Sequence, residues 1–400
     1  MSVSGSRRLF SRFITSPGIL VVSILVVAGW TNAPAQVDKK TSDRIYLFDP
    51  ATKKEEDVYG KIEEESPLGL KVRVRKGKND ELIDIPTAKI MRVYYYTPDV
   101  PTIEYNRGFV NESNWEKATG TKRDEFFSRA LDGFREIERR LIGRPEARRY
   151  LQYRIAMLLV NASRENPSKR DDAINALKEF TSDNLTSFTI INALTTQGRL
   201  LEEANRPDEA RVAYEALASL PGVPPSVARQ GDLLVGRMFL RSGKFAEAQK
   251  RFASLASKLG PGDADKPCVD IYLTESQIGL GKTDGADKAL LAAIQATEDG
   301  RLRALAHNLL GDLKMKKGQQ AQAFWHYLRV DALYNDDPEE HARALFHLAT
   351  LYDKVKNDPA RASETKRRLF DEAFKATRYQ KLAREAGMAP PSENPETKGS

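Results

Sequence analysis

Apolar residues recur at every second position in the N-terminal part of the chain, between residues 43 and 97. Leu70, Val72 and Val74, for example, alternate with charged residues. A period of two predicts strands with one buried face, and turn residues separate four or five such runs. A sheet this small protects its edges best by curling, so we expect a small all-β, barrel-like module over residues 43–97.

The period changes to between three and four from residue 121 to residue 387. Phe127, Ala130, Phe134 and Ile137 fall on one stripe, which is typical of an amphipathic helix. Residues 98–120 show neither period and are expected to form an irregular linker. The fold class predicted by these patterns is mainly α, with the β module placed before a long helical region.

A small residue recurs at a nearly constant interval in the helical region. The spacings between its successive occurrences are 38, 38, 37 and 38 residues, at Gly198, Gly236, Thr274, Gly311 and Ala349. An interval this regular indicates an internal repeat of helix, turn and helix. Each such pair has two apolar faces, so neighbouring pairs must stack to bury both.

The unit around Gly236 resembles a tetratricopeptide repeat. Gly236 stands at the helix-packing position and Phe239 follows it, Gly243 makes the turn, and Ala248 and Phe252 mark the second helix. The resemblance covers about 250 residues and implies an α-solenoid of five to seven units. The basic segment 361–384 would then form the polar cap that ends the stack. The order of the N-terminal runs also resembles that of SH3-like or Sm-like small barrels.

The tetratricopeptide resemblance implies that the first helix of each pair lines a concave groove. The residues expected to point into it are Thr195, Arg199, Arg237, Arg241, Glu275, Asn308 and Asp312. Their mixed charges favour a protein or peptide partner, and the alternative is that they are only solvated side chains. The Lys and Asn set with which some family members clamp a peptide carboxylate is absent.

The basic residues Lys71, Arg73 and Arg75 would share one outward strand face of the β module. Such a patch could bind an anionic polymer. We favour instead a solvated face whose charges discourage edge pairing, because the acidic run 63–65 is close enough in sequence to neutralise it.

Residues 1–35 have the three parts of a cleavable export signal. Three arginines are followed by an apolar run over residues 19–28 and then by Ala33-Pro34-Ala35. We expect cleavage after Ala35 and a location in the periplasm or cell envelope, with residues 36–42 as a linker and 388–400 as a disordered tail. Two alternatives stay open. The segment 6–10 resembles a twin-arginine signal, and an apolar run extended over residues 14–30 would make an uncleaved anchor.

Charge argues against nucleic acid as the partner. Removing residues 1–35 takes away three arginines and no acidic residue, which leaves a net charge of +4 against +7 for the whole chain. A balance this even gives no basic footprint. We also expect no membrane span once the signal is removed. The sequence carries no signal for an oligomeric state.

Candidate catalytic residues are sparse, so we expect a protein that is not an enzyme and needs no cofactor. Cys268 is the single cysteine, and none of the four histidines has a partner at metal-binding spacing on its own helix. Residues 279–283 read Gly-Leu-Gly-Lys-Thr, but Ser276 replaces the first glycine of a phosphate loop. The main alternative is an envelope enzyme accessory or hydrolase with its site near residues 94–105, between the β module and the array.

Overall fold

A computed structural model describes residues 41–77, 79–98, 100–141 and 143–388. The signal, its alternatives, most of the 36–42 linker and all but the first residue of the tail lie outside these residues. The chain divides into two compact units. One contains most of the β-sheet (up to residue 63, with 71–85 and 89–96), and the other contains the helices together with residues 64–70 and 86–88.

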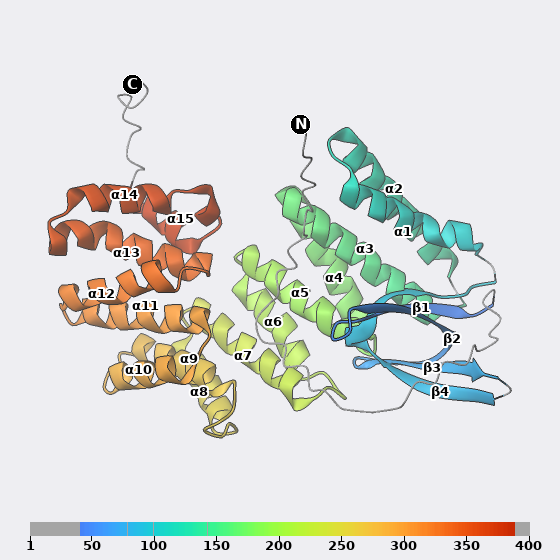
Figure 1. Ribbon diagram of the computed structural model, residues 1–400, viewed down its shortest axis with the longest axis horizontal. Helices are drawn as coiled ribbons and strands as arrows, with labels where there is room; N and C mark the ends of the chain where they lie inside the picture. The colour runs from blue at the N-terminus through green and yellow to red at the C-terminus, as the bar shows by residue number, and fades with distance from the viewer. Residues whose placement is uncertain (1–40, 78, 99, 142, 389–400) are drawn as a thin grey trace, which may run out of the picture. The chain divides into compact units, whose positions relative to one another are not determined.

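The N-terminal module is a five-stranded sheet with the order β4-β3-β2-β1-β5 (Figure 1). Strand β1 pairs antiparallel with both β2 and β5, so Ile45 faces Val58 on one side and Val93 on the other. The described pairings include none between β4 and β5, and closure into a barrel stays a prediction. The strands are β1 (Asp43–Asp49), β2 (Lys54–Ser66), β3 (Gly69–Lys76), β4 (Asn79–Pro86) and β5 (Ile90–Tyr94), with a 3₁₀ turn at Thr87–Lys89.

Alternation decides which face of this sheet is buried. Leu70, Val72 and Val74 on β3 are buried, while the charged residues between them are half-buried or exposed. This is the period-two pattern of the sequence realised on one strand.

Fifteen α-helices follow in the described residues. They are α1 (Thr102–Lys117), α2 (Thr121–Arg140), α3 (Pro145–Glu165), α4 (Arg170–Asp183), α5 (Ile190–Glu203), α6 (Pro207–Ala218), α7 (Pro225–Arg241), α8 (Phe245–Ala256), α9 (Lys266–Gly279), α10 (Ala286–Ala296), α11 (Gly300–Lys316), α12 (Gln320–Leu333), α13 (Pro338–Lys356), α14 (Pro359–Leu369) and α15 (Arg378–Glu385). Short 3₁₀ turns lie at Pro167–Lys169 and Glu372–Phe374. Consecutive helices from α1 to α14 pack in pairs, as the repeat predicted, and the fold is a TPR-like α-solenoid (Figure 1).

Helix α1 corrects the expectation of an irregular linker over residues 98–120. The pattern of its sequence is weakly amphipathic, and its order comes from packing on α2. Gly108 and Gly133 let the two backbones approach closely, and Phe109 lies edge-on to Phe134 with ring centroids 4.9 Å apart. The first helix pair is therefore α1 with α2, and the array begins about twenty residues before residue 121.

The recurring small residue marks where the two helices of a pair touch. A Cβ atom added to Gly236 would lie 2.4 Å from the ring of Phe252, and one added to Gly311 would lie 2.6 Å from the ring of Tyr327. In both pairs the aromatic residue stands sixteen positions after the glycine. Thr274 at the weaker unit is also buried. The predicted packing position is thus confirmed by the close approach of the helices.

The turn within a pair repeats as well. Gly243, Gly281 and Gly318 each have φ near +70 to +80°, where glycine meets no steric penalty, and Asn205 takes the same place with φ 56°. Gly281 is therefore the helix-ending glycine of a repeat. The Gly-Leu-Gly-Lys-Thr segment is the end of α9 and the turn that follows it, and a helix precedes it in place of the strand that a phosphate loop would need.

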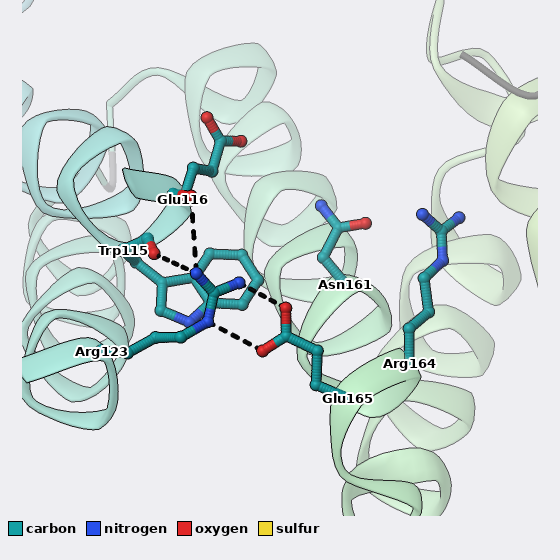
Figure 2. Close-up of a pocket in the computed structure, with 6 residues that line it drawn as sticks. All are labelled: Trp115, Glu116, Arg123, Asn161, Arg164 and Glu165. Carbon is teal, nitrogen blue, oxygen red and sulfur yellow. Dashed lines mark hydrogen bonds and ion pairs between the residues drawn. The ribbon is translucent and has the colours of Figure 1, made fainter. Parts of the chain in front are cut away.

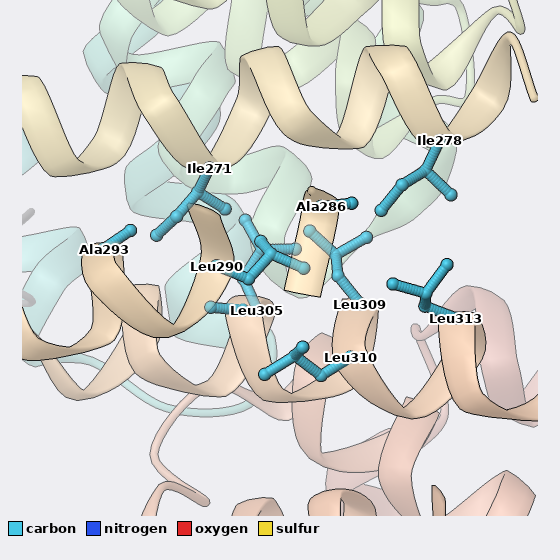
Figure 3. Close-up of a cluster of buried hydrophobic side chains, with 10 residues drawn as sticks. Ile271, Ile278, Ala286, Leu290, Ala293, Leu305, Leu309, Leu310 and Leu313 are labelled. Atoms are coloured by element: carbon cyan, nitrogen blue, oxygen red, sulfur yellow. The ribbon is translucent and has the colours of Figure 1, made fainter. Parts of the chain in front are cut away.

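Buried side chains of neighbouring pairs form a continuous core. Figure 3 shows one part of it, where leucines of α10 and α11 meet Ile271 and Ile278 of α9. At the C-terminal end, Leu369, Phe374 and Ala383 cover the last apolar surface of α13. The basic segment 361–384 thus caps the stack, with most of its charged residues at least partly exposed and Arg368 half-buried against Asp331.

Candidate functional site

Four charged residues occupy the same repeat position on the first helices of successive pairs. Arg199 is on α5, Arg237 on α7, Glu275 on α9 and Asp312 on α11, and each comes directly after its packing residue. Helix α7 contacts α9, and α9 contacts α11. Arg199 is exposed and the other three are partly exposed. We call these four residues the charged row. The structure gives them the equivalent positions that the repeat predicted.

Glu202 on α5 holds the arginine end of the row. Its carboxylate accepts a hydrogen bond of 2.6 Å from the hydroxyl of Tyr214 and one of 2.9 Å from Arg241, and the Arg237 guanidinium lies 3.8 Å away. Burial and the charge of Glu202 raise the pKa of Tyr214, so this hydroxyl stays a donor. Glu202 itself is largely covered, which leaves the arginines as the accessible charges at this end.

Asp312 has three partners at the opposite end. It accepts a hydrogen bond of 2.6 Å from Tyr327, pairs with Arg343 of α13, and lies 3.5 Å from Nε2 of His347. Burial acts to raise the pKa of Asp312, but the nearby Arg343 and His347 and the hydrogen bonds outweigh it and hold the pKa below its ordinary value. Asp312 is therefore an ionised, structurally committed carboxylate.

Two of the predicted groove residues have local structural roles. The Asn308 amide donates to the backbone oxygen of Glu340 at 2.9 Å and to its side chain at 2.8 Å, and Asn308 is fully buried. The Thr195 hydroxyl donates to the Ile191 carbonyl at 2.7 Å within its own helix. Asn308 thus ties α11 to α13, and the structure does not join Thr195 to the charged network.

Glu275 differs from every other member of the row. It has no hydrogen bond or ion pair within the part of the chain that the structure describes. Burial raises its pKa to about 7, and the carboxylates of Glu340 and Asp312 act in the same direction, while Arg343 and Arg237 oppose them. A carboxyl group with this pKa carries only part of its charge near neutral pH and is ready to accept a cation.

Sequence reasoning missed three residues that interact with the charged row. Glu202 stands four residues after the packing glycine Gly198, on the same helix face, and that spacing could have identified it. Glu340 and Arg343 gave no such signal, because they lie nine and six residues before Ala349. They reach the row only because α13 packs against α11.

A separate pocket of about 220 Å³ lies among α1, α2 and α3 (Figure 2). Arg123 occupies its centre and stacks on Trp115, with its guanidinium carbon 4.7 Å from the ring centroid. It pairs with both carboxylate oxygens of Glu165 and donates to the Trp115 carbonyl at 2.7 Å. Arg123 and Glu165 are thus used to fasten the three helices to one another.

The structure brings two histidines together that the sequence kept apart. Nδ1 of His307 and Nδ1 of His326 are 3.2 Å apart, from α11 and α12. Burial lowers the pKa of both to about 4, so both rings are neutral at pH 7 and one donates to the other. Across the described ranges no group of three potential metal ligands occurs. Burial also raises the pKa of Cys268 to about 12, which keeps its thiol protonated.

The basic patch of the β module is partly neutralised. Nε of Arg73 lies 3.1 Å from Glu63, and this pairing lowers the pKa of the Glu63 carboxyl. Lys71 also has an interaction partner. Among Lys71, Arg73 and Arg75, only Arg75 has no identified partner in the described residues. The acidic run thus contributes one of the counter-charges that the sequence suggested.

The segment proposed for an alternative catalytic site is lined by structural residues. Tyr95 and Tyr105 are buried in the cores of their own units. The buried carboxylate of Asp43 accepts backbone hydrogen bonds from Ile62 at 2.9 Å and Tyr96 at 2.8 Å, so it ties strands together. In the described residues no helix combines the length and the apolar character needed to cross a bilayer.

No family model matches the chain, and no curated protein matches it either. Several solved structures share helical arrangement with it. A tetratricopeptide repeat protein from Parabacteroides merdae is 13% identical over 70% of this chain and 99% of its own, with a TM-score of 0.49. The C-terminal part of a TPR repeat-containing protein from Cytophaga hutchinsonii is 13% identical over 68% and 98%, with a TM-score of 0.39. The quorum sensor NprR from B. thuringiensis, in its apo form, is 15% identical over 70% and 78%, with a TM-score of 0.40. Identities this low say nothing about ligands or activity.

Proposed function

We propose that this protein is an exported, non-enzymatic scaffold that binds a protein or peptide segment along the concave face of its TPR-like array. The observation that carries the proposal is the charged row. Four side chains at equivalent places of successive repeats remain accessible, although the residue before each is buried against the partner helix. Repeat arrays present extended binding surfaces in this way, one contact per repeat.

The array supplies rigidity for such a surface. Asn308, Arg343 and Tyr327 fix the side chains of the acidic end, and Glu202 fixes the arginines. Side chains held in place before binding lose less conformational entropy when a partner arrives. Export is proposed from residues 1–35, and cell fractionation with N-terminal sequencing of the mature protein tests it.

Site-specific photo-crosslinking in the source organism tests the binding proposal. The full chain carries a benzoylphenylalanine at Arg199 or Arg241 in one set of variants. In the control set it replaces Val212 or Leu291, which are exposed on the second helices α6 and α10. We expect one discrete protein adduct from the first set and none from the second, with the same adduct lost when Arg237 is changed to Glu. Adducts from the control positions alone, or no adduct from Arg199 and Arg241, contradict the proposal.

A further inference from the structure

Charge is divided unequally along the inner helices. At the α5 and α7 end, Arg199, Arg237 and Arg241 outnumber Glu202 and Glu203, their nearest carboxylates. At the α9, α11 and α13 end carboxylates outnumber guanidinium groups, because Glu275, Asp312 and Glu340 are matched by Arg343 from these helices, and Arg237 of α7 adds only a weaker effect on Glu275. A surface that is positive at one end and negative at the other can orient a segment of opposite polarity.

Two acceptors at the acidic end are left without donors. Glu275 has no partner in the described residues, and the side-chain oxygen of Asn308, which is fully buried, has no hydrogen-bond partner. Asn308 lies one turn before Asp312 and its amide already binds Glu340. An acceptor without a donor costs free energy, and at the half-buried Glu275 a donor supplied by a ligand recovers it, whereas the fully buried Asn308 oxygen lies out of a ligand's reach.

The groups facing Glu275 come from three other helices. Arg237 reaches it from α7, Asp312 from α11, and Glu340 and Arg343 from α13. The Arg343 guanidinium is committed to Asp312, with Glu340 3.5 Å away, and Arg237 is shared with Glu202. The resident cations are therefore engaged elsewhere, and the carboxyl of Glu275 lacks a dedicated counter-charge.

We propose that the array binds an extended protein segment that places a lysine or arginine side chain against Glu275 and an acidic side chain against Arg237 and Arg241. This inference rests on the proposed function and names the chemistry of its ligand. Helices α7 and α9 are neighbours, and packed helices lie about 8–10 Å apart. An extended chain rises about 3.3 Å per residue and every second side chain points to the same face, so the acidic and basic residues of the ligand stand about two positions apart, and their long side chains span the remaining distance.

Selection from a random twelve-residue peptide display library tests the inference with the full chain as bait. Wild-type protein is expected to enrich peptides with a basic residue and an acidic residue about two positions away. With Glu275→Gln the basic preference disappears while the acidic one stays. With the double variant Arg237→Gln, Arg241→Gln, the preference for an acidic residue disappears while the preference for a basic residue stays. The matched control is Glu247→Gln, an exposed glutamate on α8, which should enrich the same peptides as wild type.

A synthetic version of the most enriched peptide measures how much its basic residue contributes to binding affinity. Its dissociation constant, measured by fluorescence anisotropy, should rise at least about tenfold when its basic residue is replaced by glutamine. The same replacement should have little effect on binding to the Glu275→Gln protein, because the pair is already broken. Circular dichroism verifies that each variant is folded, and the exchange of Glu for Gln keeps the side-chain shape.

Cys268 reports where the peptide lies. It is seven residues before Glu275 on α9, and therefore on the same helix face. Because burial raises the pKa of Cys268, its alkylation by a maleimide is slow in the free protein and is followed at mildly alkaline pH until a rate is measured. Bound peptide should slow that rate at least about twofold. Enriched peptides that protect Cys268 but have no basic preference overturn the charge pairing and leave the proposed function standing. If no peptide is enriched, or if no enriched peptide protects Cys268, both the charge pairing and the proposed function fail.

Discussion

Replacing Glu275 by Gln should stabilise the free protein, and the gain should depend on pH. The pKa of Glu275 rises from its ordinary value of 4.5 to about 7 in the folded chain. The folded state therefore holds the proton more tightly than the unfolded state does. Its contribution to stability is complete below pH 4.5 and is lost as the pH rises to 7.

The magnitude follows from that shift. One pKa unit corresponds to about 1.4 kcal/mol, so ionised Glu275 lowers the free energy of unfolding by up to about 3 kcal/mol above pH 7. Glutamine fills the same space and cannot ionise. Glu275→Gln should therefore exceed wild type by up to about 3 kcal/mol at pH 8 and by less than about 0.5 kcal/mol at pH 4.5.

Urea unfolding followed by circular dichroism at both pH values measures the difference. Helical arrays can unfold in several steps, so the comparison uses the first transition midpoint of matched samples. Glu247→Gln, an exposed glutamate on α8, is the control and should leave the midpoint unchanged at either pH. A Glu275→Gln protein that is no more stable at pH 8 than wild type, or equally stabilised at both pH values, refutes the reasoning.

Two further predictions concern the packing of the repeats. Gly236→Ala should lower stability by about 1–2 kcal/mol despite the helix propensity of alanine, because the new Cβ would lie 2.4 Å from the fully buried Phe252 ring. Thermal unfolding checks this against Gly300→Ala, where no heavy atom lies within 4 Å, and equal melting temperatures would contradict it. The neutral pair His307 and His326, whose pKa values are lowered to about 4, should make the chain acid-sensitive. Their contribution is complete well above pH 6.5 and falls as the pH drops to 5, by about 2 kcal/mol for the more buried His307 and by less for His326. A His307→Gln, His326→Gln double variant should lose less stability than wild type between pH 7 and pH 5, and an equal loss in urea midpoints would count against the assignment.

The helical repeat could be predicted from the sequence because its causes are local. The packing residues recur at a spacing of 37 or 38, the aromatic partner follows after sixteen positions, and the turn needs a residue that tolerates positive φ. Each of these requirements acts within one helix pair. Helix α1 was missed because it has only a weak apolar stripe, and its order depends on the contact between Gly108 and Phe134, which lie 26 positions apart.

The charged row was likewise accessible to sequence reasoning, since its members occupy one place in the repeat unit. Their partners were not. Arg343 meets Asp312 across 31 positions, and His307 meets His326 across 19, at places where the sequence repeat carries no equivalent pair. The unpaired state of Glu275 is likewise a property of its neighbours on α7, α11 and α13.

The sequence by itself thus determined the helix-turn-helix unit, its period and the helix face that carries charge, because backbone propensity, close packing and turn chemistry all act over short distances. Only the tertiary structure decided which charges neutralise one another. That choice depends on how successive pairs stack and rotate, and stacking places charged side chains from three other repeats near the carboxyl group of Glu275.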